Sequence, residues 1–474
     1  MSASQQKPNI VWIMSDDLSW GDLGCFGQEK VATPNIDRLR AEGMQMTGCH
    51  SASPLCAPAR SSLMQGLHQG HATVRDNMVG CEDGKYRHSL QPEDVTVAEV
   101  LKGAGYATGL FGKWGLAVHD QPGIPNNKGF DEFFGYLNQR KAHNYYPPYL
   151  WHNREKVELP GNAGHDHTQP NEYDEQGRII PNGVEDRNQA AYSFDEYASR
   201  SLEFVREHAG NPFFLYQAFT IPHSAFEVPE LGQYAERDWP LTHRVYAAMV
   251  TRMDSVLGDL LALLEQEGVE EETLLFFVSD NGYSFDGAVE DPSLDELFHH
   301  RGPWKGAKGN LHQGGVRVPA IARWPGRIEP GSSSDRPWTF CDFLPTAAEV
   351  AGVGSPEDTD GVSILPILSG EGDPSREGNP LYWEFRDEQA ARIGDYWIYR
   401  SHPDHPVEVY EADSDPREET DLASEKPDLV SEAEQIFRSQ HTPTPYFASP
   451  GEMKDEWDAR REKAGAELCD NVNT

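Results

Sequence analysis

Residues 9–17 read NIVWIMSDD, an apolar run that ends abruptly in Asp16 and Asp17. Its apolar residues stand at consecutive positions rather than alternate ones. This pattern is typical of a strand that is buried on both faces of a parallel sheet. We therefore predict a central strand here, with two aspartates at its carboxyl end.

Strands of the same kind alternate with helices along the chain. The expected helices cover residues 34–43, 97–102, 193–208 and 242–267, and the expected strands cover residues 107–111, 212–219 and 273–279. The first helix has a Thr33 cap and Pro34 at its first position, both common at helix starts. The alternation predicts an α/β fold with a large, mostly parallel mixed sheet sandwiched by helices.

A segment rich in glycine, proline and charge, residues 370–380, is the expected domain boundary. After it, we expect strands at 381–385, 391–393 and 396–399 and a charged helix at 452–467. The predicted organisation is an N-terminal α/β domain over residues 1–374 and a smaller C-terminal α+β domain, with an antiparallel sheet, over residues 375–474.

Polar side chains come directly after four of the predicted strands: Asp16 and Asp17, Lys113, His223, and Asp280 and Asn281. Because ligands of α/β sheets bind at the carboxyl ends of the strands, we expect these residues to gather there. Their carboxylate and amide oxygens suit Ca²⁺ or Mg²⁺ rather than zinc. Arg60, Lys113, Lys308 and His223 would add cationic or proton-donating groups, a combination that suits a sulfate or phosphate ester.

Cys56 stands in the segment SPLCAPARSS, residues 53–62. The chain has six cysteines, and none has C-x-x-C spacing, which indicates neither a disulfide framework nor a zinc site. We predict that a helix begins at Arg60. Cys56 would then lie just before a helix N-terminus, where backbone N–H groups favour an anion.

These segments resemble the type I, formylglycine-dependent sulfatases. Residues 56–60 match the C-x-P-x-R signature, residues 112–114 read GKW, and residues 301–319 resemble the family's lysine segment before GG-x-R-x-P. The likeness extends from Pro8 to about residue 420. It implies an arylsulfatase-like member of the alkaline phosphatase-like superfamily, in which a formylglycine-generating maturation enzyme oxidises the cysteine to Cα-formylglycine.

The resemblance also implies residue roles. The Ca²⁺ ligands, with Mg²⁺ as the alternative ion, would be Asp16, Asp17, Asp280, Asn281 and the modified Cys56. Arg60 would hold the aldehyde hydrate, Lys113 and Lys308 would bind the sulfate oxygens, and His223 or Lys308 would protonate the leaving alcohol. The implied cycle is attack of the hydrate on sulfur, release of the alcohol, and elimination of sulfate to regenerate the aldehyde.

Gly115 departs from the family pattern. The family commonly reads Gly-Lys-Trp-His, and that histidine assists the last step of the cycle. Either the step runs through solvent or another histidine replaces it, and the candidates are His50, His68, His71, His119, His143 and His312. We expect His68 or His71 to do so, because both follow the nucleophile segment closely in the sequence.

Aromatic and amide-rich loops predict a sugar substrate. Residues 138–153 are too polar for a core, and their tyrosine, tryptophan and amide side chains suit stacking on sugar rings. The expected substrate-binding residues are His68, His71, Arg75, Asn77, His143, Tyr145 and His312. We expect a sulfated mono- or oligosaccharide of galactose, fucose or N-acetylhexosamine type. The alternatives are a phosphonate monoester or phosphodiester hydrolase of the same superfamily and a non-catalytic protein that binds sulfated glycans.

The chain is strongly acidic, with 40 Lys and Arg against 77 Asp and Glu and a formal net charge of −37. A field of this sign disfavours nucleic acids and anionic membrane surfaces as partners. The N-terminus shows no leader pattern, and no apolar run approaches the ~20 residues that span a bilayer. The expected location is cytoplasmic for the chain as it stands, or periplasmic or secreted if a leader has been removed.

Overall fold

The computed structural model describes residues 7–77, 88–162, 190–284 and 292–464, and three two-residue strands between 172 and 184. Its central feature is a ten-stranded sheet with the order β15-β2-β14-β13-β1-β11-β4-β5-β6-β7. The strands are β1 Asn9–Asp16, β2 Met44–Met46, β4 Ala107–Lys113, β5 Glu132–Tyr136, β6 Tyr149–His152, β7 Glu155–Glu158, β11 Phe213–Pro222, β13 Thr273–Ser279, β14 Ala320–Arg323 and β15 Ser332–Ser334.

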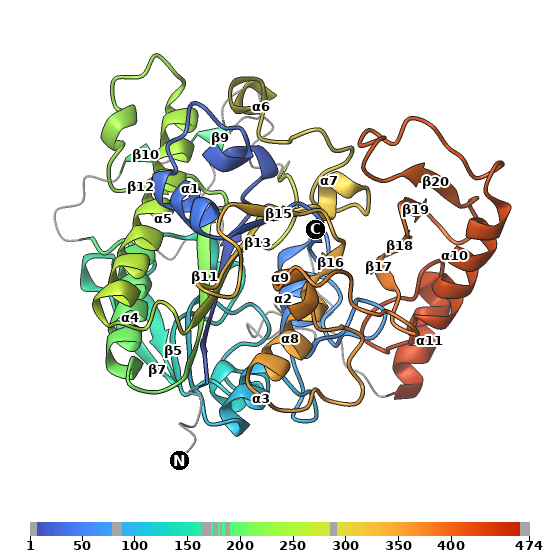
Figure 1. Ribbon diagram of the computed structural model, residues 1–474, viewed down its shortest axis with the longest axis horizontal. Helices are drawn as coiled ribbons and strands as arrows, with labels where there is room; N and C mark the ends of the chain where they lie inside the picture. Colours follow the sequence, from blue (N-terminus) through green and yellow to red (C-terminus); the bar gives the residue numbers. More distant parts are fainter. Residues whose placement is uncertain are drawn as a thin grey trace.

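Helices cover both faces of this sheet (Figure 1). They are α1 Pro34–Glu42, α2 Cys56–Gln65, α3 Val97–Gly103, α4 Ser193–His208, α5 Leu241–Gln266, α6 Pro292–Phe298, α7 Gln313–Val316, α8 Phe343–Val350 and α9 Leu365–Leu368. Four helices that the sequence predicts, α1, α3, α4 and α5, are present within one or two residues of their expected bounds. The predicted α/β class is confirmed.

Strand β1 shows why the sheet is buried on both sides. All eight of its residues are buried. Ile10, Trp12 and Met14 pack in the core beneath α2, α3 and α8, whereas Val11 and Ile13 pack in the core beneath α1, α4 and α5. Successive side chains of a strand point to opposite faces, so an uninterrupted apolar run serves both cores.

The middle of the sheet is parallel, and its edges are mixed. Strands β13, β1, β11, β4 and β5 pair in parallel, whereas β14 pairs antiparallel with β13, and β6 pairs antiparallel with β5. The four strands that the sequence singles out for their polar ends are therefore neighbours. Their carboxyl ends meet at one edge, as predicted.

The C-terminal unit, residues 381–464, contains a four-stranded antiparallel sheet of β17 Leu381–Phe385, β18 Glu388–Ile393, β19 Tyr396–Arg400 and β20 Glu408–Glu411. Three of these strands are predicted from the sequence, and β20 is not. Helix α10, Pro427–Ser439, is also missing from the prediction, and α11, Lys454–Ala464, corresponds to the expected terminal helix. The boundary between residues 374 and 375 stays a prediction.

The C-terminal sheet packs directly against the rest of the molecule (Figure 1). Trp383 and Trp397 share an apolar cluster with Leu311 and Val316, and the partly buried Leu55 packs against this cluster. The indole N–H of Trp383 donates to the Ser51 carbonyl at 2.8 Å. The residues just before the start of α2 therefore pack against the C-terminal sheet.

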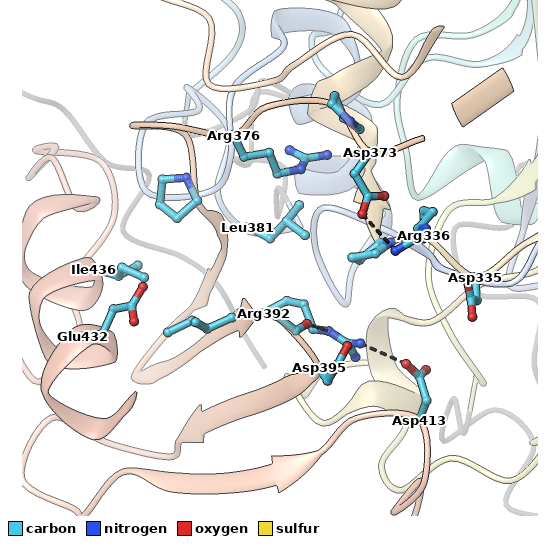
Figure 2. A pocket seen from close by; sticks show the side chains of 15 residues that line it. Asp335, Arg336, Asp373, Arg376, Leu381, Arg392, Asp395, Asp413, Glu432 and Ile436 are labelled. Atoms are coloured by element: carbon cyan, nitrogen blue, oxygen red, sulfur yellow. Dashed lines mark hydrogen bonds and ion pairs between the residues drawn. The ribbon is translucent and has the colours of Figure 1, made fainter. Parts of the chain in front are cut away.

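A pocket of about 410 Å³ lies at the seam between the two sheets (Figure 2). Arginines in its wall pair with carboxylates: Arg336 contacts Asp373 at 2.9 Å, and Arg392 contacts Asp413 at 2.9 Å. Among the described residues, no helix is both long and apolar enough to cross a membrane.

Candidate active site

Helix α2 places Cys56 at the carboxyl edge of the sheet. The helix begins at Cys56 itself, after the extended residue Leu55, and not at Arg60 as the sequence suggests. Pro58 hides this start in the sequence, but proline is tolerated in the first turn because the N–H groups there have no helical partner. Cys56 is wholly buried, and its Sγ lies 3.4 Å from Asp16 Oδ1 and 3.5 Å from Asn281 Oδ1.

The Cys56 thiol is not itself a reactive group. Burial raises its pKa well above the usual range, and the nearby Asp280 carboxylate raises it further. A thiol that stays protonated at neutral pH is a weak nucleophile and a poor metal ligand. Unmodified Cys56 therefore lies at the centre of the site without the reactivity of a catalytic cysteine.

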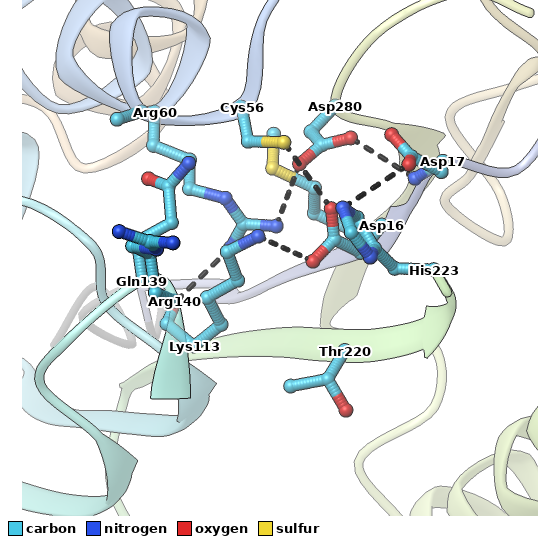
Figure 3. A network of polar contacts seen from close by, with 12 residues as sticks. Asp16, Asp17, Cys56, Arg60, Lys113, Gln139, Arg140, Thr220, His223 and Asp280 are labelled. Carbon is cyan, nitrogen blue, oxygen red and sulfur yellow. Dashed lines mark hydrogen bonds and ion pairs between the residues drawn. The ribbon is translucent and has the colours of Figure 1, made fainter. Parts of the chain in front are cut away.

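Three carboxylates and one amide converge beside Cys56 (Figure 3). The Asp17 N–H donates to Asp280 Oδ1 at 3.2 Å, and Asn281 Nδ2 donates to Asp17 Oδ1 at 2.8 Å. Four side chains offer donor atoms within 4.8 Å of one another: Asp16, Asp17, Cys56 and His223. Burial, with the charge of Asp16, raises the pKa of Asp280. A divalent cation would relieve this repulsion, so the oxygen-rich set fits a hard metal ion.

Two buried cations face these carboxylates (Figure 3). Lys113 Nζ lies 2.5 Å from Asp16 Oδ2, and Arg60 Nη2 lies 2.9 Å from Asp280 Oδ2. Burial opposes charge on Lys113, but Asp16 together with Cys56 and Asp280 outweighs it, so the pKa of Lys113 is raised. Burial likewise opposes charge on Arg60, yet Tyr216 and Asp280 raise its pKa. Both side chains remain cations inside the protein.

Lys308 and His223 flank Asp17. Lys308 Nζ lies 2.7 Å from Asp17 Oδ2, and His223 Nε2 lies 3.3 Å from the same oxygen. His223 Nδ1 contacts the Ser224 carbonyl, which requires a proton on Nδ1. His223 Nε2 is therefore the atom that faces the carboxylates and Lys308, 3.3 Å from Lys308 Nζ.

His68 and His71 do not lie with Cys56. They follow the C-terminal end of α2, and the ten residues of that helix separate its two ends by about 15 Å. His71 Nδ1 contacts Asp360 Oδ1 at 2.9 Å, and His68 Nε2 contacts Gln440 Oε1 at 2.9 Å. Their placement does not support the expectation that one of them replaces the histidine that is absent at position 115, and a contact of either with substrate stays a prediction.

Arg75 and Asn77 lie on the segment that returns along α2. Arg75 is buried, donates to the Ala72 carbonyl at 2.9 Å and lies 3.8 Å from Glu384 of the C-terminal sheet. Asn77 Oδ1 accepts the Ala57 backbone N–H at 3.0 Å, next to Cys56. Arg75 therefore contacts the C-terminal unit, and Asn77 fixes the start of the nucleophile helix.

Tyr145 and His312 hold structure together rather than line an open surface. Tyr145 is wholly buried, and its hydroxyl donates to the Thr220 carbonyl at 2.8 Å. This corrects the expectation that residues 138–153 are too polar for a core, because the Tyr145 ring supplies apolar area while its hydroxyl donates to backbone carbonyls. His312 contacts Glu418 through Nδ1 at 2.5 Å and packs on Tyr399 of the C-terminal unit.

His143 is the one predicted substrate-binding histidine that the described structure brings to the centre of the site. Its ring lies parallel to that of His223, with 3.7 Å between ring centroids and 16° between planes. Sequence reasoning missed Gln139 and Tyr216. The Gln139 amide donates a hydrogen bond to Asn77, and the Tyr216 hydroxyl lies 3.4 Å from Arg60 Nη1. Gln139 stands in the polar segment that the sequence analysis singles out. Tyr216 lies inside a buried strand, where nothing distinguishes it from a core residue.

The chain matches known protein families over most of its length. Residues 8–353 match the family described as Sulfatase, and residues 307–429 match the family described as N-sulphoglucosamine sulphohydrolase, C-terminal. The chain belongs to the sulfatase family. It is therefore a hydrolase of sulfate esters with the alkaline phosphatase-like fold, as predicted.

Two relatives and two solved structures illustrate how far the similarity of this sulfatase extends. The N-acetylgalactosamine-6-sulfatase of Canis lupus familiaris is 32% identical over 388 residues, covering 78% of this chain and 67% of its own. The N-acetylgalactosamine-6-O-sulfatase of Bacteroides thetaiotaomicron is 28% identical and covers 93% and 94% of the two chains.

Both solved structures share the fold with this sulfatase. The structure of Ps i-CgsB in complex with k-i-k-neocarrahexaose has a TM-score of 0.76 and 23% identity, and it covers 98% of this chain and 100% of that chain. The phosphonate monoester hydrolase of Agrobacterium radiobacter has a TM-score of 0.61 at 20% identity, covering 91% and 95% of the two chains.

Proposed function

We propose that this sulfatase hydrolyses a sulfate ester on a mono- or oligosaccharide, using Cα-formylglycine made from Cys56 and a bound Ca²⁺. The observation that carries the proposal is the position of Cys56, whose unreactive thiol lies within 3.5 Å of both Asp16 and Asn281. A buried neutral thiol is a poor ligand for the hard metal ion that the surrounding oxygen atoms suit. An oxygen nucleophile at the same position would bind that ion. When bound, the ion would polarise the sulfate group.

The chain's own residues divide the remaining work. Lys113 and Lys308 stand on two sides of the carboxylates, so their ammonium groups can bind separate oxygens of one sulfate. Arg60 is held by Asp280 and by the Lys113 carbonyl, which fixes its guanidinium beside Cys56. His223 Nε2 is directed into the site and can hold the proton that the leaving alcohol requires.

Relatives and surface chemistry support a sugar substrate. The curated relatives at 28–32% identity include sulfatases named for N-acetylgalactosamine 6-sulfate. Beside the segment that carries His143, the partly buried Tyr149 ring lies 4.1 Å from Lys156 Nζ, and the Trp151 ring stacks on His119. Aromatic rings beside cations suit a sulfated sugar, which presents both apolar ring faces and negative charge.

The test is production with a formylglycine-generating enzyme, followed by intact mass and turnover. We expect the peptide that contains Cys56 to show the mass of the aldehyde, and we expect sulfate release from a panel of sulfated galactose, fucose and N-acetylhexosamine derivatives. Cys56→Ala is the matched control that cannot be modified. Hydrolysis of phosphodiester or phosphonate esters with no sulfate release would contradict the proposal, as would full modification without turnover of any ester.

A further inference from the structure

The turn from Gln139 to His143 is tied to the nucleophile helix. Gln139 Nε2 donates to Asn77 Oδ1 at 2.6 Å, and the same oxygen accepts the Ala57 backbone N–H at 3.0 Å. Ala57 directly follows Cys56. The turn, whose last three residues form the short helix η4 Lys141–His143, is therefore connected to the residue after Cys56 by a chain of two hydrogen bonds.

Gln139 also occupies the space beside Gly115. The Gly115 backbone has φ +79°, and a Cβ atom there would lie 3.0 Å from Gln139 Oε1. This left-handed conformation strains any L-side chain, and the neighbouring amide leaves little room. A histidine at position 115 would strain the backbone and would require Gln139 to shift, and the chain carries glycine there, so a second imidazole of this site has to come from another part of the chain.

His143 brings such an imidazole from the same turn. It is partly buried in a cationic environment: desolvation, with the nearby His223, Lys113 and Lys308, lowers the pKa of His143 well below its usual value. The ring is therefore neutral. Within the part of the chain that the structure describes, its Nε2 is buried and has no hydrogen-bond partner. Buried polar atoms are nearly always paired in folded proteins, so this nitrogen calls for a ligand.

We propose that His143 is a catalytic residue of this site, whose Nε2 contacts the sulfate group of the substrate and takes the place of the histidine that Gly115 excludes. The inference rests on the proposed function. Lys113 and Lys308 supply positive charge to the sulfate, and the neutral imidazole supplies one directed N–H donor. Its stacking on His223 places this donor beside the group that protonates the leaving alcohol.

Sulfate binding to unmodified protein tests this contact without turnover. The test uses Cys56→Ala protein with Ca²⁺, titrated with inorganic sulfate in a calorimeter. We expect His143→Ala to weaken sulfate binding about tenfold or more, as for the loss of a hydrogen bond to a charged group. His143→Gln keeps an N–H donor and should recover much of the affinity. His402→Ala, a partly exposed histidine of the C-terminal unit, is the control and should bind sulfate normally.

A double-mutant cycle separates direct contact from an effect through His223. If His143 contacts sulfate, His143→Ala weakens binding in the His223→Ala background as well as in the parent. An effect that vanishes in the His223→Ala background would reduce His143 to a packing partner and overturn the proposal, as would a Cys56→Ala protein that binds no sulfate. Turnover by the wild-type enzyme is measured separately, so failure of the proposed function is recognised independently.

Discussion

Lys113 Nζ lies 2.5 Å from Asp16 Oδ2, and both side chains are completely buried. Lys113 ends β4 and Asp16 ends β1, with β11 between the two strands. A buried charge is tolerated only when another charge or hydrogen bonds compensate it. The pair therefore couples the sulfate-binding lysine of the proposed mechanism to a proposed metal ligand.

Replacing Lys113 should damage both activity and stability. We expect Lys113→Ala to lower kcat/KM by about 10²–10³-fold, as for the loss of one preorganised group that stabilises transition-state charge. In the metal-free protein it should also lower the free energy of unfolding by about 3–5 kcal/mol, because the buried Asp16 carboxylate would lose the cation that it contacts. Steady-state kinetics and urea unfolding measure the two effects. Wild-type activity in Lys113→Ala would contradict the assignment.

Metal binding should stabilise the folded enzyme. Chelation should abolish turnover, and Ca²⁺ should restore both turnover and the melting temperature, with about 2.7 kcal/mol of stabilisation at a free ion concentration 100 times Kd. Asp17→Asn should lose most of this thermal shift. The control is Asp360→Asn, which changes the carboxylate that contacts His71 and should keep the thermal shift. Restoration by Mg²⁺ but not by Ca²⁺ would replace the proposed ion.

Gly115→His should not create a better enzyme. The backbone φ of +79° alone predicts a loss of about 1–2 kcal/mol in stability, and the contact with Gln139 adds to it. Gly115→Ala should show most of this loss, because the strain begins at Cβ. Gly103→Ala is the control, since a Cβ there meets nothing within 4 Å. Thermal unfolding decides, and a Gly115→His protein as stable as wild type would contradict the steric argument.

His50 should make stability fall in weak acid. It is fully buried and lies parallel to Trp397, and burial, with the positive Arg317 and Arg392 nearby, lowers its pKa well below the usual value. In the unfolded chain its pKa is about 6.5, so below that pH the unfolded state binds one more proton than the folded state. Stability should therefore decrease as pH falls below about 6.5, by up to about 1.4 kcal/mol per pH unit.

His50→Gln removes this titration and so separates it from other groups. Its free energy of unfolding should change less between pH 7 and pH 5 than that of the wild type, although its stability at pH 7 can be lower. Urea unfolding at the two pH values measures the difference. Equal pH slopes in the two proteins would show that His50 does not lose a proton on folding.

The spacing of apolar residues and the polar residues at strand ends were enough to predict most of the fold. Short apolar runs such as residues 9–14 predict strands that are buried on both faces. The polar residues that follow four such strands, Asp16, Lys113, His223 and Asp280, must lie together if the strands are parallel. The start of α2 was placed one turn late because Pro58 resembles a helix breaker. Strand β20 was not predicted because it has only four residues, two of which are glutamates, and only part of it is buried.

Substrate-binding residues were harder to predict because they depend on the path of loops. His68 and His71 lie close to Cys56 in sequence, but α2 carries the chain away before they occur. Tyr145 has the composition of a sugar platform, yet its hydroxyl is used by the Thr220 carbonyl. The position of His143 depends on a turn whose anchor, the bond from Gln139 to Asn77, joins segments 62 residues apart.

The C-terminal unit contacts the two segments that carry Cys56 and Lys308. Leu55 precedes the nucleophile position and packs against the cluster that contains Trp383. The Lys305 N–H donates to the Pro416 carbonyl at 2.8 Å, and the Leu311 N–H donates to Glu388 at 2.7 Å, on either side of Lys308. The C-terminal unit, residues 381–464, is thus no detachable module. A substitution there, far from Cys56 in sequence, would lower activity by displacing the segments that carry Cys56 and Lys308.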